Sequence, residues 1–171
     1  VRLLARERDV GLAFALALLV LGLDMATKTS VAAYLPYHDT VALLPMLNLT
    51  YALNTGAAFS FLADAGGWQR PLFTGIGIAA SVMLWWLMRS KTAPRAERLA
   101  FALILGGALG NVFDRVVRGA VVDWIDLYWR DWHWPAFNVA DAGISIGAVI
   151  LLVVAFRRAP PSFLHIVNRR S

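Results

Sequence analysis

Residues 99–115 read LAFALILGGALGNVFDR, a run of apolar and small residues that closes with a carboxylate at Asp114. Gly106 and Gly110 have the G-x-x-x-G spacing that allows membrane helices to pack closely. A carboxylate within an apolar helix costs at least about 2.5–3.5 kcal/mol on insertion scales and normally faces the interior of a helix bundle. The segment therefore predicts a membrane-spanning helix with a functional polar end.

The whole chain has the composition of a membrane protein. Of its 171 residues, 59% are hydrophobic and 16% are charged, whereas a soluble domain usually has about 45–50% apolar and about 25% charged residues. About 20 helical residues span the hydrocarbon core. We therefore expect a single membrane domain over 1–171 with helices at about 10–35, 69–89, 96–114 and 139–157. The first apolar run is followed by Asp24 and Lys28 instead of an A-x-A cleavage site, so we expect a retained span and not a signal peptide.

The basic residues predict the orientation of these helices. About eleven of the sixteen Lys and Arg residues fall at one end of the expected bundle. They are Arg2, Arg6, Arg8, Arg89, Lys91, Arg95, Arg98, Arg157, Arg158, Arg169 and Arg170. The positive-inside rule assigns this end, with both termini, to the cytoplasm. A basic tail over 160–171 near anionic lipid fits the same orientation.

The two segments between the expected helices on the opposite side, about 38–60 and 119–130, look β-rich. Leu47, Leu49, Tyr51 and Leu53 alternate with polar or small residues, as in a half-buried strand. Residues 121–128 are rich in β-branched and aromatic side chains. The predicted fold class is an all-α membrane protein with four transmembrane helices and a small extracytoplasmic β-sheet. The tryptophans over 124–134 are expected to anchor at the outer interface.

Several function classes are excluded or disfavoured. The absence of cysteine excludes thiol catalysis, disulfides, zinc–thiolate sites and iron–sulfur sites. The three histidines do not have the spacing of a metal motif. The net charge of +5 comes from short basic clusters between apolar runs and not from one basic face, so we do not expect nucleic acid as a partner.

Three carboxylates are expected at one depth in the membrane. Asp24, Asp114 and Asp141 each lie fifteen or sixteen residues from a charged residue at the basic end of their helix. At about 1.5 Å per residue this places them about 23 Å above the inner boundary. A hydrocarbon core about 30 Å thick would hold all three within its outer leaflet.

Asp141 and a fourth acid, Asp123, have no basic neighbour in the sequence. Asp24 can instead be neutralised by Lys28 at i+4, and Asp114 by the adjacent Arg115. Two close carboxylates do not both ionise easily and tend to share a proton. The ionised member can activate water as a general base while the protonated member polarises a carbonyl. This pattern is typical of an aspartic hydrolase, whereas Asp123 taken alone can equally be the acid of a capped turn or of a strand end.

Four sequence blocks in order resemble the lipoprotein signal peptidase (signal peptidase II) family. They are Asp24–Lys28 (DMATK), Asn54–Phe59 (NTGAAF), Gly106–Arg115 followed by Gly119 and Val121–Asp123, and Phe137–Asp141 (FNVAD). The resemblance implies that Asp123 and Asp141 are catalytic, and that other matched residues order the site or contact substrate. These supporting residues are Asp24, Lys28, Asn54, Gly56, Asn111, Asp114, Arg115, Asn138 and Ala140. Met25 departs from the family, which often has Gln there.

The resemblance further implies an endopeptidase of the bacterial inner membrane with its active site near the outer face. Its substrates would be diacylglyceryl-modified prolipoproteins, cleaved on the amino side of the lipidated cysteine. No metal, cofactor or covalent intermediate is implied, and no oligomer. From the residues alone, Arg115 can either clamp a substrate carbonyl or hold Asp114, and each asparagine can form a turn instead of binding substrate.

Three alternatives to a peptidase with two aspartates remain. A proton-coupled membrane carboxylate transporter would string its acids across the bilayer instead of placing them at one level. A Ser–Lys dyad would need Lys28 and Ser30 to face each other, which residues two apart on a helix do not. A non-catalytic signal-peptide binder would lack turnover.

Overall fold

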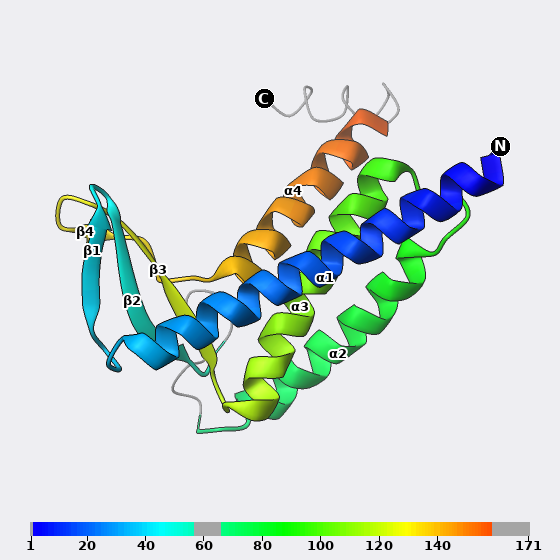
Figure 1. Ribbon diagram of the computed structural model, residues 1–171. Helices are drawn as coiled ribbons and strands as arrows, with labels where there is room; N and C mark the ends of the chain where they lie inside the picture. Colours follow the sequence, from blue (N-terminus) through cyan, green and yellow to red (C-terminus); the bar gives the residue numbers. More distant parts are fainter. Residues whose placement is uncertain (1, 57–65, 159–171) are drawn as a thin grey trace, which may run out of the picture.

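The computed structural model describes residues 2–56 and 66–158 and contains four helices and four strands within these ranges. The helices are α1 (Arg2–Tyr34), α2 (Gln69–Met88), α3 (Arg95–Val117) and α4 (Val139–Arg158). The strands are β1 (Thr40–Leu44), β2 (Leu47–Asn54), β3 (Val121–Trp129) and β4 (Trp132–His133). Figure 1 shows a helix bundle with the sheet at one end, beside the last turns of α1.

All four helices are long and apolar enough to cross a membrane, so the predicted set of four membrane-length helices with a small sheet is confirmed. Helix α1 begins at Arg2 and not near residue 10, so the charged residues before the apolar run are also helical. Helix α3 continues to Val117, three residues beyond the expected end. Asp114 therefore lies within the last turn of α3 and not at its last position.

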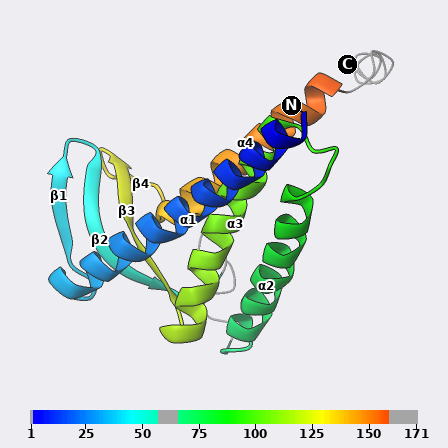
Figure 2. The same ribbon diagram turned by 45° about the vertical axis from the view of Figure 1, so that its right-hand side comes forward.

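Helix α3 lies at the centre of the bundle, with α1, α2 and α4 around it (Figures 1 and 2). Small residues make these contacts close, as the G-x-x-x-G spacings predict. A Cβ atom added at Gly106 would lie 2.8 Å from Cβ of Val20 on α1, and one added at Gly147 on α4 would lie 2.7 Å from the carbonyl oxygen of Ala100 on α3. The polar ends of three helices are thereby held next to one another.

The sheet is antiparallel in the order β1-β2-β3-β4. The strands expected at 47–54 and 121–128 are confirmed by β2 and β3. The alternation in β2 does not separate a buried from an exposed face, because almost every residue of the strand is half-buried. The first residues of β3, by contrast, are fully buried against the helices, and β2 pairs with them through Asn54↔Val121 and Ala52↔Asp123.

Candidate active site

A cavity of about 540 Å³ opens where the polar ends of α3 and α4 meet β2 and β3. Its polar lining comes from Asn54, Asn111, Arg115, Asp123, Asp141 and Ser145. The rest of the wall is apolar. It comes from Phe73, Ile76 and Ala80 on α2, Ile104 and Ala108 on α3, Ile144 and Ile146 on α4, and the segment 134–137. A mostly apolar cavity with a few convergent polar groups is typical of a binding site for a small molecule or a short segment of chain.

Asp123 reaches the cavity from β3 because of the turn that follows α3. Gly119 in that turn has φ +84°, a left-handed conformation that glycine adopts without the steric cost of a Cβ. The strand then starts in the buried end of the bundle. The Asp123 carboxylate is 3% exposed and accepts hydrogen bonds from Nδ2 of Asn54 (3.0 Å) and Nδ2 of Asn138 (2.7 Å).

Asp141 enters the same cavity from the first turn of α4. Its Oδ1 accepts a hydrogen bond of 2.9 Å from Nδ2 of Asn111 on α3. Its backbone N–H donates to Oδ1 of Asn138, the residue before the helix, at 2.9 Å. Asn138 thus caps α4 and binds Asp123 with the other end of the same amide, so one buried side chain fixes the strand acid relative to the helix acid.

Asp123 and Asp141 have no ion-pair partner among the described residues. Burial raises the pKa of Asp123 to about 7, and the negative charge of Asp141 adds to this effect. The hydrogen bonds from Asn54 and Asn138 act in the opposite direction but are weaker than burial. Asp123 is therefore partly protonated near neutral pH.

A second buried cluster lies beside the two acids, centred on Lys28 of α1. Its Nζ is 2.7 Å from Oδ2 of Asp24, 3.1 Å from Oδ2 of Asp114 and 2.9 Å from Oδ1 of Asn111. These contacts use the three donors of an ammonium group. Since Asn111 gives its amide to Asp141 at the same time, Lys28 also sets the orientation of the group that binds Asp141.

Asp24 and Asp114 connect this cluster to the backbone of the neighbouring elements. Oδ1 of Asp24 accepts from the N–H of Ala140 in α4 at 2.8 Å. Oδ2 of Asp114 accepts from the N–H of Val122 in β3 at 3.2 Å. The residue that precedes each of the two acids, Val122 before Asp123 and Ala140 before Asp141, is therefore held by a carboxylate through its backbone N–H.

The interpretation of Arg115 as the partner of Asp114 is wrong. Adjacent residues on a helix diverge in direction, whereas residues four apart share a face. Asp114 accordingly pairs with Arg118, which also donates to Oγ1 of Thr29 (2.9 Å). Arg115 donates to the carbonyl oxygens of Gly56 (2.8 Å) and Asn111 (3.3 Å), and it lines the cavity.

The structure places the block 54–56 beside the cavity through a local turn. The N–H of Gly56 donates to Oδ1 of Asn54 at 2.9 Å, while Nδ2 of Asn54 binds Asp123. This asparagine therefore forms a local turn and also binds the carboxylate of Asp123. Residues 57–59 of the same block and the tail 160–171 lie outside the described residues.

Sequence reasoning missed two features of the site. Arg118 was not singled out, although its i+4 spacing from Asp114 is a usable signal. The aromatic stretch over 124–134 was expected mainly to anchor at the interface, and its last residue, Trp134, also lines the cavity, as does Phe137 beyond the stretch. Phe137 reaches it because its backbone pairs with Ile125 of β3, a contact between distant residues that local composition does not predict.

Comparison with known proteins identifies a family for this sequence. The sequence model of the family described as Signal peptidase (SPase) II matches residues 16–157. A protein of Pseudoalteromonas atlantica named Lipoprotein signal peptidase is 49% identical over 152 residues, which cover 88% of this chain and 93% of that protein. A protein of the same name from Yersinia pseudotuberculosis is 52% identical over 155 residues, 90% of each chain.

Solved structures agree with the fold. A structure titled as a bacterial membrane enzyme at 2.3 Å resolution superposes with a TM-score of 0.77 at 31% identity, covering 86% of this chain and 88% of that one. A second with the corresponding title at 1.9 Å gives a TM-score of 0.75 at 30% identity, over 87% and 95% of the two chains.

Proposed function

Because this chain belongs to the signal peptidase II family, we propose that Asp123 and Asp141 are the catalytic residues of its aspartic peptidase activity. One observation carries the assignment. The buried carboxylate of Asp123 and the half-buried carboxylate of Asp141 line one cavity from different elements, and the amide of Asn138 joins the Asp123 carboxylate to the backbone N–H of Asp141. The other carboxylates near this site, Asp24 and Asp114, are paired with Lys28 and so are not available as bases.

In the proposed reaction the two acids share one proton. Asp123, whose pKa is raised to about 7, holds it, and Asp141 is ionised. Asp141 takes a proton from a water molecule as that water attacks the scissile carbonyl carbon. The protonated Asp123 donates a hydrogen bond to the carbonyl oxygen, which develops negative charge. The proton taken by Asp141 then passes to the leaving amine as the C–N bond breaks, which regenerates the pair.

The substrates proposed for this chain follow from the name of its relatives, which implies prolipoproteins. We expect cleavage on the amino side of a diacylglyceryl-modified cysteine. The apolar wall formed by Phe73, Ile76, Ile104, Ile144 and Ile146 would contact the acyl chains. Asn54 and Arg115 are placed at the polar end of the same cavity, where a peptide backbone offers carbonyl oxygens and N–H groups.

The proposed location is the bacterial inner membrane, with the basic ends of the helices in the cytoplasm. The start of α1 and the end of α4 lie together at the end of the bundle opposite to the sheet (Figure 1). Together with the positive-inside rule, this arrangement supports a position of the sheet and the two acids at the outer face. The whole chain would act as one domain, with membrane lipid as its surroundings and no oligomer required by the site.

The test is a gel-shift cleavage assay on the purified protein in detergent, with one prolipoprotein supplied with and without diacylglyceryl on its cysteine. Asp123→Asn and Asp141→Asn should each reduce turnover by at least a thousandfold. A thermal unfolding scan should show that both variants are still folded. Asp126→Asn is the matched control, because Asp126 is a buried acid of the same strand that does not line the cavity. Its turnover should be close to that of the unchanged protein.

Robust turnover by either catalytic variant would refute the assignment of the two acids. Equal cleavage of the lipidated and unlipidated substrates would refute the proposed substrate requirement. A folded protein that binds the lipidated substrate but never cleaves it would support the non-catalytic binder instead.

A further inference from the structure

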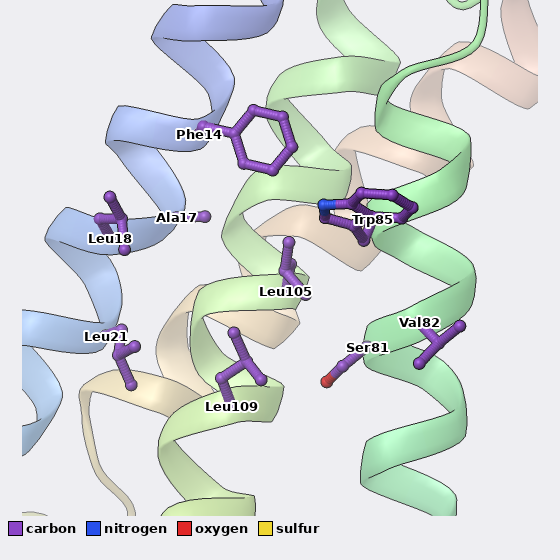
Figure 3. A pocket seen from close by; sticks show the side chains of 9 residues that line it. All are labelled: Phe14, Ala17, Leu18, Leu21, Ser81, Val82, Trp85, Leu105 and Leu109. Atoms are coloured by element: carbon purple, nitrogen blue, oxygen red, sulfur yellow. The ribbon is translucent and has the colours of Figure 1, made fainter.

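A second cavity, separate from the candidate active site, lies between α1 and α2 over a different face of α3. It is an open groove with a volume of about 430 Å³. Figure 3 shows its side chains converging from three helices: Phe14, Ala17, Leu18 and Leu21 of α1, Ser81, Val82 and Trp85 of α2, and Leu105 and Leu109 of α3. The one hydroxyl in this lining, on Ser81, donates to the carbonyl oxygen of Gly77 in its own helix. The groove is therefore almost entirely apolar.

The position of the groove along the helices matches one leaflet of a bilayer. Phe14 and Leu21 are seven residues apart, so the groove extends about 10 Å along α1. Trp85 lies four residues before Arg89, the residue that caps the end of α2, which corresponds to about 6 Å along the helix axis. Half of a hydrocarbon core of about 30 Å is about 15 Å. The groove thus starts near the basic end of the bundle and ends near its middle.

A cation stands at the basic end of the groove. The guanidinium carbon of Arg89 is 4.6 Å from the ring centroid of Trp85, which forms the wall next to it. Arg98 fixes this end of α2, because its buried side chain donates to the carbonyl oxygens of Met88 (3.0 Å) and Ser90 (3.0 Å). An apolar groove between helices with a cation at its membrane-surface end has the chemistry that binds an anionic lipid headgroup and its acyl chain.

We propose that this groove binds one anionic phospholipid of the cytoplasmic leaflet, with an acyl chain between α1 and α2 and its phosphate at Arg89. Charge complementarity favours a phospholipid over a helix of a second protein, because Arg89 lies at the membrane-surface end of an apolar groove, as a phosphate lies at the surface end of an acyl chain. The leaflet follows from the orientation proposed above, whereas the binding itself does not depend on it.

The test uses native mass spectrometry of the full chain in detergent, with phosphatidylglycerol as the anionic probe and phosphatidylcholine as the zwitterionic one. Leu18→Trp fills the groove from α1, and its matched control is Leu19→Trp, since both leucines are exposed at the helix surface but only Leu18 lines the groove. Val82→Trp with Met83→Trp is the equivalent pair on α2. Arg89→Gln is compared with Lys91→Gln.

The unchanged protein should retain one phosphatidylglycerol per chain, in preference to phosphatidylcholine by about fivefold, the effect of one cation near an anionic headgroup. Leu18→Trp and Val82→Trp should lower this retention at least tenfold, while their two controls should not. Arg89→Gln should remove the preference between the two lipids, and Lys91→Gln should leave it.

Equal retention by Leu18→Trp and Leu19→Trp, with the same result for the pair on α2, would overturn the proposal. A dimer that Leu18→Trp dissociates without any change in lipid retention would overturn it as well, since the occupant would then be a second copy of the chain. A variant that proves unfolded in a thermal unfolding scan is replaced by the variant on the opposite wall, which tests the same groove.

Discussion

Lys28→Met removes the cation at the centre of the cluster that joins α1 to the site. Lys28 is 0% exposed and lies within 3.1 Å of carboxylate oxygens of both Asp24 and Asp114. Removing one member of a buried ion pair costs about 3–5 kcal/mol, because a charge is left without compensation in a medium of low polarity. Arg118 remains bound to Asp114, so Asp24 bears most of the loss. We therefore expect the free energy of unfolding to fall by about 3–5 kcal/mol.

The charge balance of the cluster supplies an internal control. In the unchanged protein two cations, Lys28 and Arg118, face two carboxylates, Asp24 and Asp114. Lys28→Met leaves one negative charge in excess, and the double change Asp24→Asn with Lys28→Met returns the cluster to neutrality. The double variant should therefore recover about half or more of the lost stability. Lys91→Met, at an exposed position, should change stability by less than about 0.5 kcal/mol.

The assay is reversible unfolding in mixed detergent, followed by the cleavage assay on the fraction that remains folded. Turnover by Lys28→Met should fall even where the fold survives, because Asn111 loses the contact that orients its amide toward Asp141. Stability of Lys28→Met equal to that of the unchanged protein would refute the cost assigned to the uncompensated carboxylate. A double variant less stable than Lys28→Met would refute the charge-balance argument.

Three further changes test the acid pair and the helix packing. Because burial and Asp141 raise the pKa of Asp123 from 3.8 to about 7, the folded state binds this proton more tightly than the unfolded state. The stability that this group contributes is fully present below about pH 4 and is lost as pH rises through about 7, by about 4 kcal/mol. Unfolding measured at pH 4.5 and at pH 8 should show this loss, and Asp123→Asn should make the stability less dependent on pH. Cleavage should decline above about pH 7. Asn138→Ala removes the amide that bridges the two acids and should lower turnover about ten- to a hundredfold; unchanged turnover would contradict the positioning role. Gly147→Ala should destabilise the protein by about 1–3 kcal/mol, because its Cβ would lie 2.7 Å from the carbonyl oxygen of Ala100. Gly22→Ala, with open space at the Cβ, should not destabilise it. Equal unfolding curves for the two variants would refute the close packing of α3 on α4.

Much of the fold follows from features that act over a short stretch of sequence. Apolar runs of membrane length, interrupted at one end by basic residues, predicted the four helices because the bilayer leaves few other structures for such runs. The spacing i, i+4 predicted the pair of Asp24 with Lys28, which the structure shows at 2.7 Å. The equal depth of the acids predicted that separate helices bring them together, as Lys28 between Asp24 and Asp114 demonstrates.

The remaining features depend on contacts between distant residues. Asn138 meets Asp123 only because β3 turns back after Gly119 and starts inside the bundle, and no local pattern encodes that path. Phe137 lines the cavity because it pairs with Ile125 at the edge of β3. The adjacent Arg115 was one candidate partner for Asp114, whereas the geometry of the helix favours Arg118 at i+4.

The Lys28 cluster and the Asp123–Asp141 pair have opposite electrostatic designs, and this difference supports the different roles proposed for their carboxylates. Around Lys28, each carboxylate faces a cation at ion-pair distance and acts as a structural anchor. Asp123 and Asp141 are instead held by neutral amides, which orient an oxygen without fixing its charge. Arg115, the cation nearest to them in the lining of the cavity, gives its hydrogen bonds to the carbonyl oxygens of Gly56 and Asn111. A proton can therefore move onto and off the Asp123–Asp141 pair during a reaction, whereas the same movement at Asp24 or Asp114 would leave Lys28 buried with fewer partners and would cost stability.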